Sequence, residues 1–491
     1  MTVDLFQTDI YALKAALESG KLTSLRLVEA YIARIEDRDE TTKSVICVNP
    51  YAREVAQKSD DTRQKGEIIG LALQGANFAE EAAVVGKLRA AGAIILGKTN
   101  VSEWGNARRT DGWSAVRGRT LGAYSDTQHP GGSSCGSAVA VRLGFAAAAV
   151  GTELNMGLTS SAAKASLVGL KPTPGFVSRA GMVIGDAFQD GPVLITRTVD
   201  DAALLMTLLA GNAKTSEATT ISRRKSALLL PLNSERHAER MLYKAYELPE
   251  SLRQSSIDAP TRAVFKRALQ ILEDCGAQII DHVKYDRWNW KWTDEHLHIN
   301  RALLKRSMET MFSELKDNPN SLETLGDLID YIKRTPEEEY DVYGATYLEK
   351  AWSESSRNYN LPECIIDRQS MGRDVRRLLA KYHCDVIAVP ADCRNPSDLG
   401  QCPTITVPMG FYPRDTKPLH YAGRVEVGPN IPLAPPDSLC DIVEYHLLGY
   451  AYAFERAIKS ALKKEDLPFI WPDPQPTSQK GPKNKGRKAA R

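Results

Sequence analysis

The sequence lacks the cysteine pattern of a disulfide-stabilised or zinc-binding protein. Its eight cysteines are spread over 491 residues, and none belongs to a CxxC pair. This argues for reduced thiols in an intracellular protein and against a secreted scaffold held by disulfides. The first residues also lack the basic and apolar segments of a signal peptide. We therefore predict a cytoplasmic location.

Long hydrophobic runs and an excess of charge of one sign are absent as well. No apolar run approaches the roughly 20 residues needed to span a bilayer, so we predict no association with membranes. The 63 Lys and Arg residues nearly balance the 61 Asp and Glu residues, which gives a net charge of +2. Overall charge therefore gives no clear case for nucleic acid as a partner. With 43% hydrophobic residues, the chain has enough apolar surface for a substantial core.

The C-terminal tail differs in composition from the rest of the chain. Residues 473–491 contain prolines and many lysines and arginines, and no acidic residue follows Asp473. Such a segment is expected to be disordered, because it cannot bury enough apolar surface to fold. The simplest interpretation is a solvated basic tail, and nuclear import or polyanion binding is the alternative.

Apolar periodicity predicts helices that alternate with buried strands. Thr23 or Ser24 can cap a helix whose apolar face includes Tyr31 and Ile35. A helix at 79–91 runs into the apolar segment Ala93–Leu96, which predicts a buried strand. Further predictions are a strand or helix at 145–150, helices at 199–209 and about 445–462, and strands at 385–389 and 404–407. The block from about 213 to 361 is charged, aromatic and helical in pattern, and it is predicted to be an insert.

Two other patterns suggest cofactors but fit them poorly. Residues 92–99 match the phosphate-loop pattern G-x-x-x-x-G-K-[ST]. The apolar residues inside the pattern favour a buried strand, and no helix opens at Thr99, so we do not expect nucleotide binding. The scattered histidines and cysteines lack the short paired spacing of zinc sites. We predict neither a cofactor nor a metal.

Three segments rich in small residues carry the strongest signal: Gly131–Ser137 (GGSSCGS), Gly151–Glu153 (GTE) and Gly169–Thr173 (GLKPT). Here the sequence resembles the amidase signature family, the Ser-cis-Ser-Lys hydrolases of amide C–N bonds. Other landmarks follow in family order: Gly20–Ser24, Ala91 to Trp104, Gly191–Pro192 with Thr196–Ala202, and Thr406–Gly410. The resemblance implies an α/β fold with a mixed β-sheet sandwiched between helices. It implies a domain over 1–472, with a variable helical insert at about 213–361 and the tail at 473–491.

The resemblance also implies roles for particular residues. In the family, a lysine acts through a bridging serine in a cis peptide to deprotonate a second serine, which attacks the carbonyl carbon. Backbone N–H groups just before that nucleophile stabilise the oxyanion. The bridging serine maps onto Ser133, and Gly157 occupies the nucleophile position. Leu154, Asn155 and Met156 occupy the oxyanion-hole positions.

No residue of this sequence takes the place of the family lysine. Family members carry a segment like H-G-I-P-V-x-x-K-D-N, whereas residues 66–70 here pass directly to residues 71–75. Lys65 precedes the gap, Lys87 lies in a predicted helix, and Lys98 belongs to a different family landmark. A skipped exon would explain the missing segment but not the change at Gly157.

These losses favour a family member that no longer hydrolyses amides and whose pocket binds a small amide or acyl ligand. One alternative is an active amidase with a rebuilt site that uses Ser133 or Ser160 as the nucleophile. Another is an interaction scaffold without enzymatic activity that uses the insert or the tail. If a strand is missing, we also expect its neighbours in the sheet to expose unpaired backbone groups.

Overall fold

The computed structural model describes residues 4–57, 71–73, 76–78, 80–153, 157–183, 185–186, 189–210, 242–245, 259–280, 291–353, 361–389, 402–421, 423–432, 438–440 and 444–461. The predicted basic tail and the oxyanion-hole positions Leu154, Asn155 and Met156 lie outside these residues. Lys65 also lies outside them.

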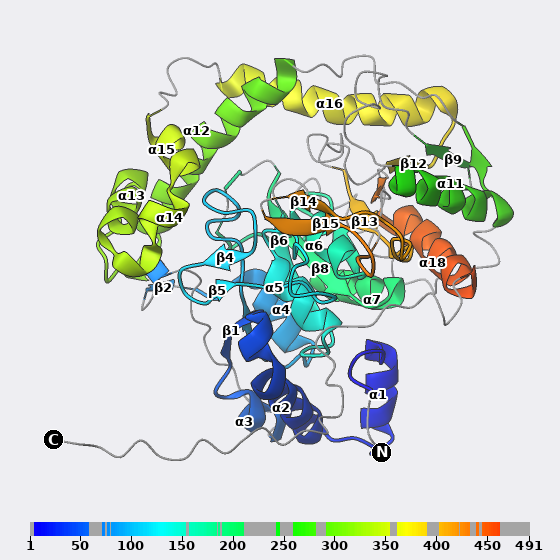
Figure 1. Cartoon of the computed structure of the whole chain (residues 1–491), viewed down its shortest axis with the longest axis horizontal. Coiled ribbons are helices and arrows are strands. Elements are labelled where there is room, and N and C mark those ends of the chain that lie inside the picture. Colours follow the sequence, from blue (N-terminus) through cyan, green and yellow to red (C-terminus); the bar gives the residue numbers. More distant parts are fainter. Residues whose placement is uncertain are drawn as a thin grey trace.

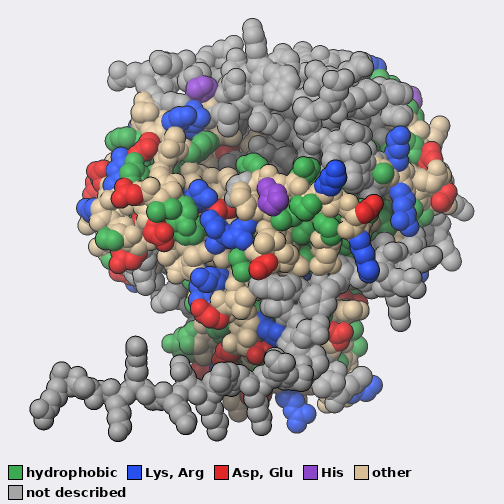
Figure 2. Space-filling model, viewed as in Figure 1, with side chains coloured by type: hydrophobic (Ala, Val, Ile, Leu, Met, Phe, Trp, Pro, Cys, Tyr) green, Lys and Arg blue, Asp and Glu red, His purple; other side chains and the backbone are tan. Residues whose placement is uncertain are grey.

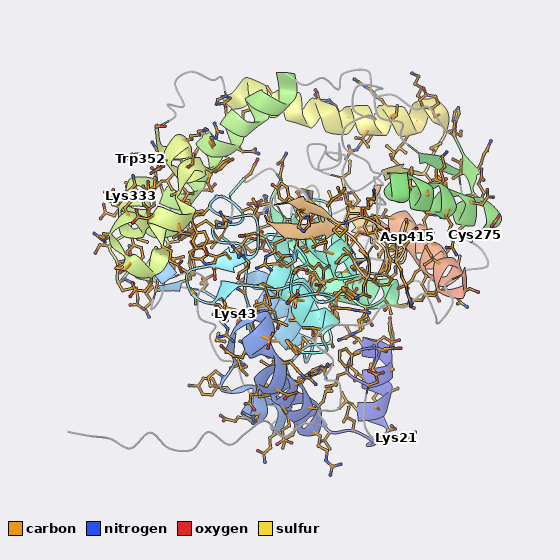
Figure 3. The ribbon with its side chains drawn as sticks, in the orientation of Figure 1. Lys21, Lys43, Cys275, Lys333, Trp352 and Asp415 are labelled. Carbon is orange, nitrogen blue, oxygen red and sulfur yellow. The ribbon has the colours of Figure 1, made fainter. Side chains whose placement is uncertain are left out.

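The N-terminal helices and a two-stranded ribbon form one end of the molecule (Figure 1). They comprise α1 (Ile10–Glu18), α2 (Ser24–Thr42), β1 (Val45–Val48), α3 (Ala52–Gln57) and β3 (Gly97–Thr99). The helix α4 (Ala83–Ala90) lies nearer the centre, where Val84 and Leu88 belong to a core beside the central sheet. The predicted start of α2 is confirmed, because the Thr23 side chain accepts a hydrogen bond from the Arg26 amide at 3.2 Å. The helix ends at Thr42, and the residue that follows, Lys43, takes a left-handed conformation with φ 52° and is labelled in Figure 3.

An eight-stranded mixed sheet occupies the centre of the molecule, as predicted. The strands have the order β10-β9-β12-β16-β13-β7-β8-β6. The pairs β10–β9 and β9–β12 are parallel, and the remaining pairs are antiparallel. Their bounds are β6 (Ala149–Glu153), β7 (Val168–Lys171), β8 (Gly191–Thr196), β9 (Leu242–Ala245), β10 (Gln278–Ile279), β12 (Val386–Val389), β13 (Thr404–Thr406) and β16 (Ser438–Cys440).

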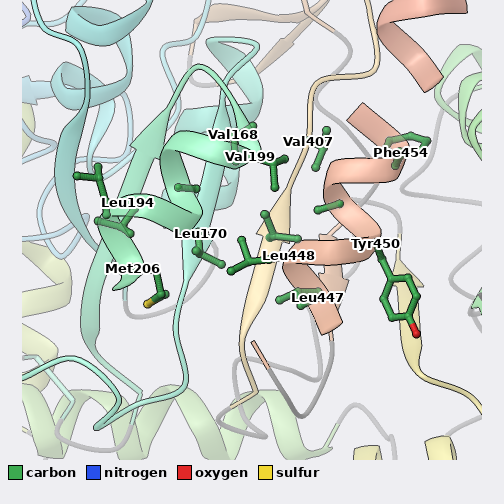
Figure 4. Close-up of a cluster of buried hydrophobic side chains, with 14 of the residues drawn as sticks. Val168, Leu170, Leu194, Val199, Met206, Val407, Leu447, Leu448, Tyr450 and Phe454 are labelled. Atoms are coloured by element: carbon green, nitrogen blue, oxygen red, sulfur yellow. The ribbon is translucent and has the colours of Figure 1, made fainter. Parts of the chain in front are cut away.

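Helices cover both faces of this sheet. On β8, Val193 and Ile195 pack with α5 (Cys135–Arg142) and α6 (Gly157–Lys164) on one face. Leu194 lies in the opposite core, with α7 (Val199–Leu209) and α18 (Glu444–Ala461). Figure 4 shows this second core, where Leu170 and Leu194 of the sheet meet Met206 and Leu448 of the helices. The alternation along β8 shows that both faces of the sheet are buried.

A separate group of helices surrounds a second core and forms a lobe beside the sheet (Figure 1). It comprises α12 (Lys291–Ser313), α13 (Leu325–Arg334), α14 (Tyr340–Tyr343) and α15 (Thr346–Ser353). Thr324 and Asp327 form a capping box at the start of α13. On α15, Trp352 lies against Gly326 and under the Lys305 ammonium, 4.3 Å from its ring centre, and it is labelled in Figure 3. A long helix, α16 (Leu361–Tyr382), leads from this lobe to β12.

The block predicted as a helical insert is not wholly helical. Two of its short strands, β9 and β10, join the central sheet, and α11 (Ala259–Asp274) packs against α18. The helical pattern of the block hides these strands, because each is only a few residues long. The domain boundaries at about 213–361 and 1–472 stay a prediction.

Short elements complete the fold: η1 (Leu71–Leu73), β2 (Asn77–Phe78), β4 (Trp113–Ser114), β5 (Gly118–Arg119), β11 (Leu315–Asp317), η3 (Pro336–Glu338), β14 (Leu419–Tyr421) and β15 (Arg424–Val427). In the described part of the chain, no helix is both long and apolar enough to cross a membrane. Figure 2 shows side chains of both charge signs interspersed over the described part of one face.

Most predicted elements are confirmed within a few residues, but the strand at Ala93–Leu96 is wrong. The strand begins only at Gly97, and Ala93–Leu96 is half-buried or exposed chain without regular structure. The physical reason is that β1 ends at Val48, opposite Gly97, so no described strand continues alongside Ala93–Leu96. An apolar segment adopts a stable strand only when a neighbour satisfies its backbone.

Candidate functional site

The predicted bridging serine lies in the turn that leads into α5. The peptide bond between Gly132 and Ser133 is cis, which is the isomer that the family resemblance implies here. The Ser133 carbonyl oxygen accepts a hydrogen bond from the Ser102 amide at 3.0 Å. Ser133 is 8% exposed and lies on the wall of a large cavity. The structure therefore fixes the position of Ser133, while its role stays a prediction.

Two glycines bring this turn against α6 and against the loop that follows β3. Gly131 has a φ of 80°, and a Cβ atom there would lie 2.7 Å from the Cα of Ser161. At Gly132, a Cβ atom would lie 2.7 Å from the Ser102 hydroxyl oxygen and 2.7 Å from the Asn106 side-chain oxygen. Only glycine permits such close approach at these two positions. The turn and the start of α6 are thus held together.

Gly157, at the predicted nucleophile position, is the first residue of α6. Ser160 is half-buried and Ser161 is buried, three and four residues further along the helix. A helix rises 1.5 Å per residue, so these hydroxyls lie about one turn away from the start of α6. The structure therefore brings the Ser133 turn and the Gly157 position to the same region, but Gly157 offers no side chain.

Neighbouring serines hold α5 against two strands. The Ser134 hydroxyl donates to the Thr152 carbonyl at 3.2 Å and accepts from the Thr152 amide at 3.1 Å. The Ser137 hydroxyl donates to the Val150 carbonyl at 3.3 Å and shares a hydrogen bond of 2.7 Å with Thr99. Ser134 and Ser137 therefore satisfy backbone groups along the outer edge of β6, and Ser137 links that edge to β3.

A histidine and a cysteine next to the turn are unsuited to nucleophilic catalysis. The Nδ1 atom of His129 accepts a hydrogen bond from the Gly131 amide at 3.1 Å, which places the ring proton on Nε2. Burial lowers the pKa of His129 and favours this neutral form. Burial also raises the pKa of the Cys135 thiol to about 11, so the thiol stays protonated near neutral pH.

The cavity beside Ser133 has a volume of about 1440 Å³. This exceeds the roughly 300–1,000 Å³ of ordinary small-molecule pockets. It extends between β3 and β6, from the helices α1, α2 and α7 to Ser133 and α12. Its walls include the apolar side chains of Leu27, Ile95, Leu96, Ala148, Val150 and Leu205. The cavity therefore lies between β3 of the two-stranded ribbon and β6, the end strand of the central sheet.

The lysines considered from the sequence lie in different surroundings. The Lys87 ammonium donates to the Leu209 carbonyl at 2.6 Å. Lys98, on β3, lines the same cavity as Ser133. A further buried lysine, Lys164 of α6, pairs with Glu426. Of Lys87 and Lys98, the two of these sequence candidates that the structure describes, Lys98 lies on a wall shared with Ser133.

Two buried carboxyl groups on the cavity wall were not predicted as functional. Burial raises the pKa of Asp190 to about 7, although the amides of Gly185 and Asp186 donate to its carboxyl. Burial also raises the pKa of Glu103, which accepts from the Ala115 amide at 2.9 Å and pairs with Arg108. Two family landmarks in the sequence contain Glu103 and Gly191, the residue after Asp190. A landmark does not show, however, that a nearby carboxyl group is buried.

Comparison with known proteins establishes the family of this chain. The profile of a family described as Amidase matches residues 71–416. The chain belongs to the amidase-signature family. The native peptide amidase from Stenotrophomonas maltophilia has a similar structure, with a TM-score of 0.77 and 26% identity over 93% of this chain and 98% of that one. The fold predicted from the resemblance is therefore confirmed.

Two sequence relatives support the same assignment. A protein of Arthroderma benhamiae named "Putative amidase" is 29% identical over 502 residues, which cover 93% of this chain and 82% of the relative. A glutamyl-tRNA(Gln) amidotransferase component of Lacticaseibacillus paracasei is 30% identical over 310 residues, which cover 58% of this chain and 62% of that relative. One of these relatives of the amidase-family chain is thus named an amidase, and the other is named as part of an amidotransferase.

Proposed function

We propose that this amidase-family chain binds an amide or acyl group at the Ser133 end of the cavity without hydrolysing it. The observation that carries the proposal is Gly157 as the first residue of α6. The resemblance assigns this position to the nucleophile, and glycine has no atom that could form an acyl-enzyme. The scaffold around the position remains, since the turn at Gly131 still packs against Ser161.

Other hydroxyl and thiol groups near the turn do not replace the nucleophile. The Ser134 hydroxyl is committed to both backbone groups of Thr152. Cys135 is fully buried and stays protonated. Ser160 is three residues beyond Gly157, and misplacement by far less than one helical turn costs about 100-fold in rate.

The rival proposal is a rebuilt amidase site in which Lys98 activates Ser133. One observation favours testing it, namely that both residues line the same cavity. The two proposals differ in outcome: the rival requires turnover that is lost in the Ser133→Ala and Lys98→Met variants.

The experiment measures hydrolysis of a panel of peptide C-terminal amides and small carboxamides by mass spectrometry. Peptide amides are included because the structural relative is named a peptide amidase. We expect no turnover by the unmodified chain, and none by the Gly157→Ser variant, since restoring the hydroxyl supplies no lysine. Binding is measured in parallel as a ligand-dependent rise in melting temperature. Turnover that disappears in Ser133→Ala would overturn the proposal.

The cytoplasm remains the location that we propose for this chain, with the nucleus as the alternative. An amide or acyl ligand is the proposed small-molecule partner. An interaction scaffold built on the insert or the tail stays an alternative hypothesis.

A further inference from the structure

The helical lobe has its own core, separate from the cores on the two faces of the central sheet. Its buried side chains include Met308 of α12, Leu328 of α13 and Leu348 of α15. A unit with a separate core can open locally while the rest of a protein stays folded. The contacts between the lobe and its neighbours therefore determine how firmly it is held.

The strand β4 and the loop that precedes it meet the lobe through aromatic and ionic contacts. The ring centres of Trp113 on β4 and Tyr343 on α14 lie 4.2 Å apart. The Arg108 guanidinium of the loop pairs with Glu338 of η3, which lies between α13 and α14. It also donates to the Gly344 carbonyl at 2.8 Å. Arg108 therefore joins the lobe to the loop before β4.

Three buried charged groups meet at this boundary, and their charges do not balance. The Arg108 side chain is 0% exposed, and the two carboxyl groups that it contacts, Glu103 and Glu338, are 3% and 1% exposed. Two ionised carboxylates against one guanidinium would leave a net negative charge away from water, which is strongly unfavourable. One bound proton removes this charge. Burial and the charge of Glu103 accordingly raise the pKa of Glu338 to about 7, and burial raises the pKa of Glu103.

Other charged side chains of the neighbouring elements form pairs of their own: Lys333 with Glu349 at 2.8 Å, and Arg109 with Asp111 at 2.8 Å. The acidic residues that flank Glu338 in the sequence, Glu337 and Glu339, are exposed to solvent, as is Asp341 of α14. The charges that act most on Glu338 are therefore those of Glu103 and Arg108.

We propose that Glu103, Arg108 and Glu338 form a pH-sensitive latch, which holds the lobe against the cavity wall while one proton is bound and loosens when that proton passes to solvent. Both sides of the boundary line the cavity, Glu103 from the loop, and Leu304 and Tyr347 from the lobe. Loosening the latch therefore moves one part of the cavity wall relative to another. This inference goes beyond the proposed function and does not depend on it.

The direction and size of the effect follow from proton linkage. In an open lobe, Glu338 meets water and returns to its ordinary pKa of 4.5, so the closed lobe binds the proton more tightly. The fraction of open lobe therefore rises with pH. With a pKa of about 7 in the closed lobe, that fraction rises about tenfold between pH 6 and pH 8.5.

The test is amide hydrogen exchange of the full chain at pH 6 and pH 8.5, with rates corrected for the intrinsic effect of pH on exchange. We expect the corrected rates over residues 325–347 to rise about tenfold at the higher pH. Residues 191–196, which form β8 of the central sheet, are the reference and should exchange more slowly than the lobe at both pH values. Equal corrected rates in the lobe and in β8 would mean that the lobe opens only when the whole chain unfolds, and would overturn the inference.

Three variants identify the group that titrates. Glu338→Gln removes the titrating carboxyl and keeps an oxygen for Arg108, so the rise with pH should fall below about twofold. Glu103→Gln leaves one carboxylate for one guanidinium and should act in the same way, which provides a second test if Glu338→Gln fails to fold. Glu337→Gln, at the exposed neighbouring position, is the matched control and should keep the full rise.

Melting temperatures establish which variants are folded. A rise with pH that persists in the folded latch variants would overturn the inference, and so would its loss in the Glu337→Gln control. Because no ligand enters this test, its failure would leave the proposed function unaffected.

Discussion

Replacing Arg108 by methionine should destabilise the protein strongly, because Arg108 joins the helical lobe to the cavity wall. Its fully buried guanidinium pairs with the carboxylates of Glu103 and Glu338. It also donates to the Glu338 carbonyl and, at 2.8 Å, to the carbonyl of Gly344. Removing one partner of a buried ion pair costs about 3–5 kcal/mol. The variant leaves two carboxyl groups without their cation, so we expect about 3–5 kcal/mol, with the lower figure at acidic pH.

The pH dependence of this loss follows from the carboxyl groups. Burial and the nearby charge of Glu103 raise the pKa of Glu338 to about 7 from an ordinary value of 4.5. A carboxyl with a raised pKa binds more protons in the folded state, so the free energy of unfolding falls as pH rises between these values. The Arg108 charge lowers the pKa of both carboxyls, so its removal raises them further, and holding the two carboxyls in the folded state costs more at pH 8 than at pH 5.5. The destabilisation by Arg108→Met should therefore be larger at pH 8.

The assay is urea unfolding of the wild type and the variants at pH 5.5 and pH 8. Arg53→Met is the matched control, because the Arg53 to Glu36 pair is exposed at 3.7 Å and such pairs contribute about 0–1 kcal/mol. The triple variant Glu103→Gln, Arg108→Met, Glu338→Gln should recover much of the loss, since it leaves no buried charge. Equal stability of Arg108→Met and Arg53→Met at pH 8 would refute the reasoning.

Three further predictions concern single positions. Between pH 5 and pH 8, the free energy of unfolding should fall by about 1–3 kcal/mol less in Glu338→Gln than in the wild type, because the substitution removes the titrating group. Parallel profiles of unfolding free energy against pH would contradict this. Gly136→Ala should destabilise the protein by at least about 2 kcal/mol, because its Cβ atom would lie 2.3 Å from the Asn100 carbonyl oxygen. Gly191→Ala is the control and should change the stability little, because its Cβ atom would meet no atom within 4 Å. Thermal unfolding of the two variants measures the difference. Ser137→Ala should cost about 1–2 kcal/mol and speed amide exchange in β6, because the Val150 carbonyl loses its donor; unchanged exchange would speak against the serine as an edge cover.

The sequence predicted the regular elements well where one residue pattern determines them. The cap at Thr23, the helix at 199–209 and the strands near 386 and 404 follow from local periodicity and capping. Ala93–Leu96 shows the limit of such reasoning, because its pattern is that of a buried strand but its structure depends on a neighbour far away in the sequence.

The candidate site was predicted unevenly for a similar reason. Motif spacing predicted Ser133 and Gly157 as site positions, and the structure places their segments together, while their roles stay predictions. The carboxyl group of Asp190 was missed, because its raised pKa arises from burial, which is created by the packed fold. The cavity also escaped prediction in size and extent, since its walls come from segments throughout the first half of the chain and from α12.

The most direct measurement of the central claim is covalent labelling by a fluorophosphonate, read by intact-protein mass spectrometry and peptide mapping. This probe forms an adduct with an activated serine hydroxyl. We predict that the chain remains unmodified, because Gly157, the first residue of α6, stands at the position that the family resemblance assigns to the nucleophile. A stoichiometric adduct on any serine would show an activated nucleophile and would contradict the account.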